Sequence, residues 1–535
     1  MLKNLRFYYH FFIIIVTKKY KQFLLYFFLI VLVLAIGKIF ILNLAPGIFK
    51  DLLDSARKPR YYEGVVGSVQ TLNPVYESTL AEQEIDSLVF RGLTKISETG
   101  EVEPDLAKSF TRLSDTKYRF KLKENLLWHD GAKITSDDVV YTVNLTQKTL
   151  PVSKLAANFK DVKVVKIDDY TFDFELTDPF SPFLVNTTIG IVPSHISLEK
   201  YRPVGSGEFE VKKISEKEIL LESSSAELIF RLYKNKNDAI LALKLGEIDS
   251  IGGLSFFDIQ ELRFWPNVSF YSSDLATREV ILFFNLKDKL LAEKKIRQLL
   301  SESVPKQLVS QVLPGISQEI SFSSLPLISS NKYLQEQSFK FEPQTAEKSL
   351  IDLGWKKENA ALVKKGDRLK INLTTGSDDE LFKIAQIIEQ AWEVLGVEVE
   401  IRVIDATELR DKEIPERNFQ ALLIVQQLST DSDQYSLWHS SQTNNANISS
   451  LSSDRIDKIL EDGRRTFDQE KRKEIYELFN RLLSDENPAV FLYYPKYFWV
   501  VDNDIKNISL PPLIKTSDRF KNINEWKKIG FSNLN

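Results

Sequence analysis

The longest apolar stretch of the chain lies near its N-terminus. Residues Phe23–Leu42 read FLLYFFLIVLVLAIGKIFIL and contain a single charged side chain, Lys38. A helix needs about 20 apolar residues to cross the roughly 30 Å of hydrocarbon in a bilayer. Lys38 falls in the outer third of the run, where its long stem can carry the ammonium group to the headgroups. The pattern therefore predicts a transmembrane anchor over residues 23–45.

A cleaved signal peptide is the alternative interpretation of this run. Against it, the run is long for a signal-peptide core, and Asn43-Leu44-Ala45 lacks the small first residue of an A-x-A cleavage motif. Only basic charges precede the run, at Lys3, Arg6, Lys18, Lys19 and Lys21. Because positive charge favours the cytoplasmic side, we expect residues 1–22 in the cytoplasm, 46–60 as a linker, and the main domain outside a single-pass cell-membrane anchor.

The rest of the chain mixes strand and helix patterns. Apolar residues alternate with polar ones at Tyr118-Phe120-Leu122 and at Phe172-Phe174-Leu176, which indicates half-buried strands. Val280–Leu286 is continuously apolar, which is typical of a strand buried on both faces. Thr135-Ser-Asp-Asp138 is a capping-box helix start.

The clearest unit spans residues 380–403. Its apolar residues first mark one helical face, then Gly396 provides a stop, and Val397, Val399, Ile401 and Val403 alternate as in a strand. A second helix is indicated near Ile475–Leu483, followed by strands at Ala489–Tyr494 and Tyr497–Val501. Helices alternating with strands favour an α/β fold.

Composition excludes several classes of function. The chain has 535 residues and a net charge of −4, so it carries no basic field for nucleic acid. It has no cysteine, which excludes disulfides, thiolate metal sites and a lipidated-cysteine anchor. Its four histidines, at 10, 129, 195 and 439, are far apart in sequence. We therefore expect no cofactor and no protein-built metal site.

The chain also lacks the common catalytic signatures. It contains no phosphate loop, G-x-G-x-x-G, G-x-S-x-G or H-E-x-x-H motif. His129 stands in Trp128-His-Asp-Gly131, where Asp-Gly indicates a turn. Asp137 and Asp138 occupy the first turn of a predicted helix, where acids complement the helix dipole. These residues are better explained by structure than by catalysis, and no enzyme is predicted.

A series of motifs from Tyr61 to Leu510 resembles, in the correct order, the bacterial extracellular solute-binding proteins of family 5, the peptide/nickel-binding class that serves ABC importers. The matching segments are Gln70–Pro74 (QTLNP), Phe90–Leu93 (FRGL), Glu103–Ala107 (EPDLA), Tyr118–Leu122 (YRFKL), Trp128–Gly131 (WHDG), Thr135–Val139 (TSDDV), Pro203–Gly207 (PVGSG), Leu245–Asp249 (LGEID) and Asp431–Gln442 (DSDQYSLWHSSQ). Glu208-Phe209, Ser432 and Gln434 depart from the usual Pro-Tyr and prolines.

The resemblance implies a two-lobed α/β clamshell, like that of periplasmic binding proteins, with an extra inserted domain. We expect the chain to cross between lobes near Arg278–Val280 and Tyr493–Tyr494. The predicted division is residues 61–88, 204–279 and 493–535 for lobe I, 89–203 for the inserted domain, and 280–492 for lobe II. A ligand that favours the closed state drives hinge closure.

The resemblance also implies a site for peptides, held by strand-like hydrogen bonds to their main chain. A peptide's buried ammonium needs a carboxylate partner. Asp431 is the first candidate and Asp433 the second, although both could simply shape an acidic turn. Trp438 is a candidate for lining the pocket or for the core. Asn285 is a candidate for contacting the ligand backbone or for capping its strand.

The predicted function is a membrane-tethered receptor that delivers peptides to an ABC permease with a cytoplasmic ATPase. Two alternatives stay open. One is uptake of a metal chelate or another small solute, in which the organic part makes most contacts. The other is a peptide sensor or an extracytoplasmic chaperone that does not transport.

Overall fold

The computed structural model describes residues 58–76, 79–149, 158–196, 203–312, 321, 323–327, 343–358 and 361–529, with residues 28, 29 and 32. The predicted cytoplasmic segment, nearly all of the predicted anchor and most of the predicted linker lie outside these residues. Within the described ranges, no helix combines the length and the apolar character needed to span a bilayer. Residues 60–527 form one compact unit, and the following paragraphs describe that unit.

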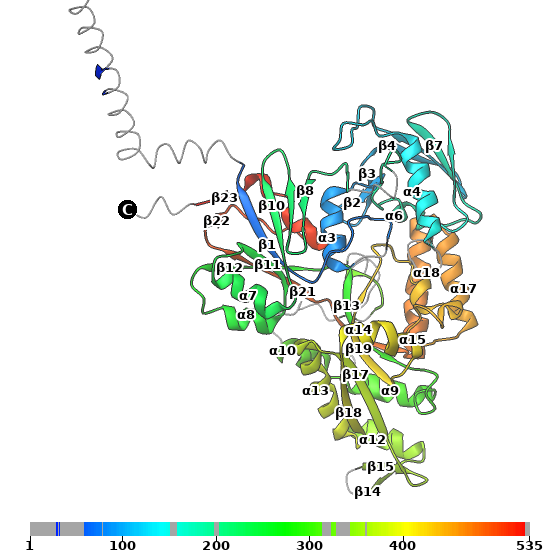
Figure 1. Ribbon diagram of the computed structural model, residues 1–535. Helices are drawn as coiled ribbons and strands as arrows, with labels where there is room; N and C mark the ends of the chain where they lie inside the picture. The colour runs from blue at the N-terminus through cyan, green and yellow to red at the C-terminus, as the bar shows by residue number, and fades with distance from the viewer. Residues whose placement is uncertain are drawn as a thin grey trace, which may run out of the picture. The chain divides into compact units, whose positions relative to one another are not determined.

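A seven-stranded mixed sheet contains both early and late parts of the chain (Figure 1). Its central strand β1 is parallel to its two neighbours, and β21 is antiparallel to both of its own. In spatial order the strands are β12 (Val268–Asp274), β21 (Lys496–Asp502), β11 (Ser250–Leu254), β1 (Arg60–Val66), β10 (Glu227–Tyr233), β9 (Glu218–Glu222) and β8 (Glu210–Ile214). The associated helices are α3 (Leu80–Val89), α7 (Lys236–Lys244), α8 (Phe256–Leu262), η4 (Thr516–Phe520) and η5 (Ile523–Glu525). The short strands β22 (Ile505–Lys506) and β23 (Lys527–Lys528) complete the C-terminal part.

A five-stranded sheet forms the second large layer. Its strands in spatial order are β18 (Glu398–Ile404), β17 (Lys370–Gly376), β19 (Ala421–Gln427), β13 (Arg278–Phe284) and β20 (Ala489–Tyr493). Even-numbered residues of β13 pack toward α13 and α9, and its odd-numbered residues pack with α16, α17 and α18. Both faces of β13 are therefore buried, which explains the unbroken apolar run seen in the sequence.

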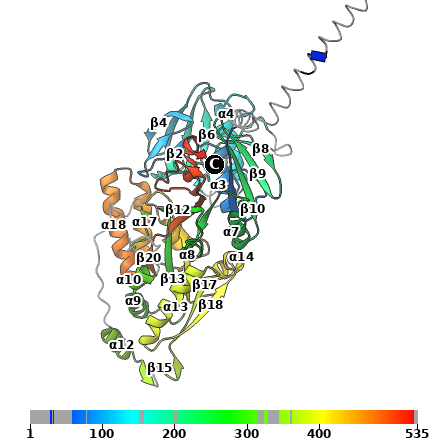
Figure 2. The ribbon, with the colours of Figure 1, turned by 90° about the vertical axis from the view of Figure 1, so that its left-hand side faces the viewer.

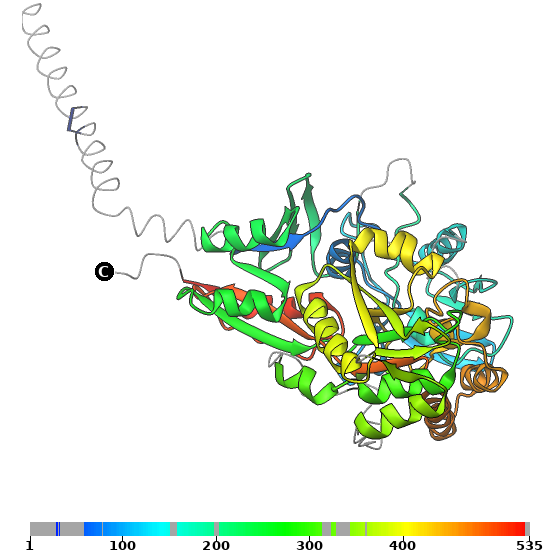
Figure 3. The ribbon, with the colours of Figure 1, turned by 90° about the horizontal axis from the view of Figure 1, so that it is seen from below.

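Helices cover this second sheet on both faces. Helix α13 lies beside β17 and β18 in the view from below (Figure 3). Helices α17 and α18 lie side by side (Figure 2). The helices are α9 (Lys294–Ser303), α10 (Lys306–Val312), α12 (Pro343–Asp352), α13 (Asp379–Val394), α14 (Ala406–Glu408), η2 (Leu409–Glu413), α15 (Ile414–Glu416), α16 (Tyr435–Trp438), η3 (Ser440–Gln442), α17 (Asp454–Arg465) and α18 (Gln469–Glu486). A small sheet joins β14 (Lys356–Glu358), β15 (Ala361–Lys364) and β16 (Asp367–Arg368).

The region between α3 and β8 has a sheet and a core of its own. Four antiparallel strands, in the order β4 (Ala107–Ser114), β5 (Lys117–Leu122), β7 (Thr171–Glu175) and β6 (Lys163–Lys166), pack with α4 (Ser136–Lys148) and α6 (Phe183–Asn186). The hairpin of β2 (Thr94–Ile96) and β3 (Val102–Pro104) precedes them. This is the region for which an inserted domain is predicted.

The chain passes between the two large sheets twice. The first passage follows β12, which ends at Asp274, and precedes β13, which begins at Arg278; the second lies between Tyr493 and Lys496. Thr277 connects both sides, because its carbonyl accepts from Leu428 N at 2.8 Å and its hydroxyl donates to Ile514 O at 3.2 Å. The division into lobes at residues 278–280 and 493–494 stays a prediction.

The glycines of Pro203–Gly207 allow close contact with the end of α3. A Cβ atom on Gly205 would lie 1.9 Å from the carbonyl oxygen of Val89, and Gly207 N donates to that same oxygen at 2.8 Å. His129 bonds back to this turn through its backbone N to Gly205 O, at 2.9 Å, and its ring Nε2 lies 3.0 Å from Gly207 O. His129 is therefore a structural residue, as the turn motif indicated.

The locally encoded elements form where the sequence predicted them. Helix α13 ends at Val394, two residues before Gly396, which has the left-handed φ of +87°. Strand β13 begins two residues earlier than predicted and ends at Phe284. Asp138, 2% exposed, accepts from Thr135 N at 2.8 Å and from Ser194 N at 2.8 Å, so this acid caps α4.

Candidate functional site

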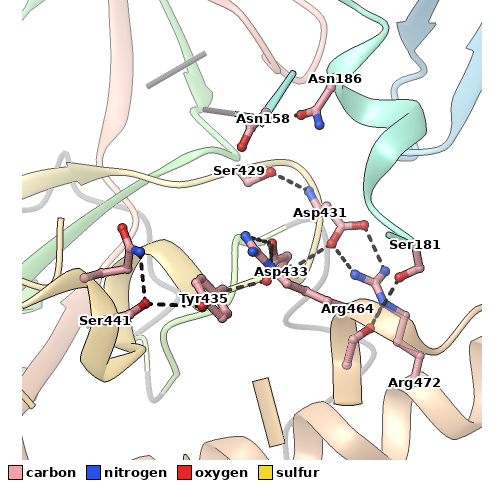
Figure 4. A network of polar contacts seen from close by, with 12 residues as sticks. Asn158, Ser181, Asn186, Ser429, Asp431, Asp433, Tyr435, Ser441, Arg464 and Arg472 are labelled. Atoms are coloured by element: carbon pink, nitrogen blue, oxygen red, sulfur yellow. Dashed lines mark hydrogen bonds and ion pairs between the residues drawn. The ribbon is translucent and has the colours of Figure 1, made fainter. Parts of the chain in front are cut away.

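The acidic segment Ser429–Tyr435 connects β19 to α16 and folds by bonding to itself (Figure 4). Asp431 N donates to Ser429 Oγ at 3.1 Å, Asp433 N to Asp431 Oδ1 at 2.8 Å, and Tyr435 N to Asp433 Oδ1 at 3.1 Å. Asp and Ser side chains favour such local turns. The spacing of the two aspartates therefore shapes the loop and brings both carboxylates toward the helix pair α17 and α18.

Asp431 is bound by Arg472 of α18. The Arg472 guanidinium donates to both carboxylate oxygens, one of them at 2.9 Å, in a bidentate pair. The two side chains are only 13% and 17% exposed. Burial alone would lower the pKa of Arg472, but the charge and hydrogen bonds of Asp431 outweigh it, so the pKa is raised. The negative charge of Asp431 is thus already compensated within the protein.

Asp433 is bound by Arg464 of α17. Arg464 Nε donates to Asp433 Oδ2 at 2.9 Å. The same guanidinium lies 3.8 Å from the ring centre of Tyr435 and 5.2 Å from that of Phe180, which belongs to the predicted inserted domain. Ser181 N donates to Arg464 O at 2.7 Å (Figure 4). Arg464 therefore connects the acidic segment to the predicted inserted domain.

The other two candidates, Trp438 and Asn285, lie next to the five-stranded sheet. Trp438 is 0% exposed, with ring centres 5.9 Å from Phe283 and 6.0 Å from Phe491. Asn285 Nδ2 donates to Arg417 O at 3.1 Å and to Phe419 O at 2.9 Å. The structure thus brings Asp431 and Asp433 together, packs Trp438 in the core, and ties Asn285 to backbone carbonyls that follow the short helix α15. A ligand-binding role for the four residues stays a prediction.

Two cavities border the acidic segment, with volumes of about 380 and 440 Å³. The first is lined by Tyr435, Arg464 and Phe180, among others, and the second by Asp431, Arg472 and Phe110. Both mix charged with aromatic side chains. Within the described ranges, no three His, Asp or Glu side chains lie close enough together to hold a metal ion.

Sequence reasoning missed a free strand edge beside this segment. Strand β19 pairs with β13 along its whole length, from Ala421 to Gln427, but with β17 only at residues 421–423. In the described part of the chain, residues 424–427 therefore have a strand partner on one side only. Val425 is 42% exposed there. The sequence signal was the change from an apolar run to Gln426-Gln427, but only the register shows that an edge is open.

Comparison with known proteins identifies the family. Residues 101–447 match the family model described as bacterial extracellular solute-binding proteins, family 5 Middle. The chain belongs to this family. It is a non-enzymatic, extracytoplasmic solute-binding protein of ABC transporters, which confirms the resemblance and the absence of an enzymatic function.

Relatives of this family 5 protein bind different solutes. It is 25% identical to the oligopeptide-binding protein AppA of Bacillus subtilis, over 84% of this chain and 88% of AppA. It is 21% identical to the nickel-binding protein NikA of Staphylococcus aureus, over 82% of this chain and 90% of NikA.

Solved structures establish the α/β periplasmic-binding-protein fold. The structure of B. subtilis AppA in complex with a nonapeptide matches with a TM-score of 0.72 at 25% identity, covering 88% of this chain and 100% of AppA. That of NikZ from Campylobacter jejuni in complex with Ni(L-His) matches with a TM-score of 0.76 at 24% identity, with the same coverage.

Proposed function

We propose that this family 5 protein binds peptides, with the peptide main chain extended along residues 424–427 of β19. The open edge carries the proposal, because a strand edge offers unpaired N–H and C=O groups to an added strand. Main-chain bonding gives affinity without selecting side chains. The similarity to AppA supports a peptide ligand, and closure of the two predicted lobes would bury it.

The proposed setting is a receptor held by its N-terminal helix on the outer side of the cell membrane. It passes its peptide to an ABC permease whose ATPase lies in the cytoplasm. In this proposal the exposed side chain of Val425 contacts the peptide. The acidic segment borders the site and connects it to the predicted inserted domain through Arg464.

Native mass spectrometry of the purified full chain tests this function. We expect the protein to carry a heterogeneous set of short peptides, because main-chain binding tolerates many sequences. After mild unfolding and refolding, a mixture of tri- to nonapeptides should restore the bound masses. Recovery of one metal chelate or one opine-like acid, with no uptake of peptides, would contradict the proposal.

A further inference from the structure

Arg278 begins β13 at the first passage between the two large sheets, beside the open edge of β19. It is partly buried and directly opposite Gln427 in the antiparallel register. Its Nε donates to Gln427 Oε1 at 3.3 Å. Arg278 and Val425 lie on the same face of the sheet, because Val280 is the partner of Val425 and is two residues further along β13. A group bound along residues 424–427 would therefore lie within reach of a guanidinium.

The charge of Arg278 is poorly compensated inside the protein. Burial lowers its pKa, while Tyr497 and Glu84, from the other sheet's layer, act in the opposite direction. In the described residues, no carboxylate lies within 4.0 Å of its nitrogens. This partly buried guanidinium has no carboxylate partner among those residues, and an arginine has donors for a bidentate anion.

Other buried or partly buried arginines of the described chain have more partners than Arg278. Arg472 and Arg519 bind carboxylates. Arg297 donates to four backbone carbonyls, those of Asn487, Leu291, Ala292 and Glu486. Arg417 also donates to four, those of Ile414, Thr443, Asn445 and Asn447. In the described chain Arg278 donates one side-chain hydrogen bond, to the amide oxygen of Gln427, and its length of 3.3 Å is long for such a bond.

The acids nearest to the open edge in sequence do not supply the missing charge. Asp431 forms an ion pair with Arg472, and Asp433 forms one with Arg464. Arg278, in contrast, lies opposite Gln427 and has no carboxylate within 4.0 Å in the described part of the chain. The prediction that a carboxylate of the acidic segment recognises a peptide's ammonium group is the alternative to this inference.

We propose that Arg278 binds a carboxylate of the ligand, so that the site recognises peptides by an acidic group rather than by their free amine. This inference rests on the proposed function and adds the charge that the ligand must carry. Gln427 is a positioning residue, because its amide oxygen accepts from Nε of the guanidinium.

A mass-coded peptide mixture tests the inference on the full chain. Tri- to nonapeptides are prepared with a free or acetylated N-terminus and a free or amidated C-terminus, and the retained species are quantified. We expect free carboxylates to be retained about 10- to 100-fold better than amides, and acetylation to have little effect, because a hydrogen bond to a charged group is worth about 1.5–3 kcal/mol. Retention of amides that contain glutamate would identify a side-chain carboxylate as the partner.

Four variants separate charge from structure. Arg278→Gln should abolish the preference for carboxylates, and Arg278→Lys should keep part of it. Gln427→Glu should also weaken it, because an internal carboxylate would then occupy the guanidinium. Arg263→Gln, at an exposed arginine that bonds to Gln260 on α8, is the matched control and should change nothing.

The outcomes distinguish the two proposals. Equal retention of acids and amides by the wild-type protein, or a preference that survives Arg278→Gln in a variant with unchanged thermal stability, would overturn the role of Arg278. A preference of the wild-type protein for peptides with a free amine over acetylated ones would also overturn the role of Arg278. Retention of no peptide at all would overturn the proposed function instead.

Discussion

Replacing Arg519 by methionine is expected to destabilise the protein by about 3–5 kcal/mol, because it leaves a buried carboxylate without its partner. Arg519 is 1% exposed and donates to Glu63, which is 0% exposed, at 2.8 Å, and to Glu84. This contact fixes η4, near the C-terminus, to β1 and α3. Burial raises the pKa of Glu63, and Arg519 opposes this shift.

Urea unfolding of the full chain measures this effect. Arg368→Met is the matched control, because Arg368 is 68% exposed in its pair with Glu398 and such a pair is worth at most about 1 kcal/mol. The double variant Glu63→Gln/Arg519→Met should recover part of the loss, because the fully buried Glu63 then carries no charge, although Glu84 still lacks its arginine. An equal effect of Arg519→Met and Arg368→Met would show that the buried network contributes little.

Replacing Asp86 by asparagine is expected to stabilise the protein at neutral pH and to change how its stability depends on pH. Asp86 lies on α3 and is 4% exposed. Burial, together with the charge of Glu82, raises its pKa from 3.8 to about 8. The folded state therefore keeps a proton up to about pH 8, which the unfolded chain loses near pH 4.

The sign follows from proton binding. Between about pH 4 and pH 8 the folded state binds more protons at this site than the unfolded state, so its stability falls as the pH rises, by up to about 1.4 kcal/mol per pH unit. Asparagine does not ionise, so Asp86→Asn should flatten the dependence of stability on pH. At pH 7 it should raise the free energy of unfolding by on the order of 3 kcal/mol.

Thermal unfolding of the wild-type protein and of Asp86→Asn at a series of pH values checks the predicted change in pH dependence. Asp137→Asn is the control, because Asp137 is 59% exposed in its pair with Lys166. If Asp86→Asn and the wild-type protein share one pH profile while Asp137→Asn is neutral, Asp86 is not the group that titrates.

Local elements of this chain could be predicted because their signals are local. The face of α13, the left-handed Gly396 and the alternation of β18 all lie within residues 379–404. The order of the family motifs likewise indicated the family without any knowledge of contacts. Gly205 belongs to a family motif, but only the structure shows why glycine is needed there: the carbonyl oxygen of Val89 leaves no room for a side chain.

The candidate site could not be predicted to the same degree, because its charges are paired over long distances. Asp431 looked available in the sequence, yet its partner Arg472 is 41 residues away on α18. No local pattern distinguishes Arg472, which is bound, from Arg278, which lacks a carboxylate in the described part of the chain. The open edge of β19 depends on where β17 stops pairing with it. The register between two strands cannot be predicted from the sequence of either strand alone.

The most direct test of the central claim is hydrogen exchange at the backbone amides of residues 424–427, with and without the mixture of tri- to nonapeptides. A peptide strand that adds to this edge should slow exchange there by about tenfold or more, because newly bonded amides must open before they exchange. The outer edge of β18 (Glu398–Ile404), which has β17 as its one strand partner in the described residues, is the internal control and should not change. Protection of β18 in place of residues 424–427, or binding of peptides with no change in either strand, would contradict the account.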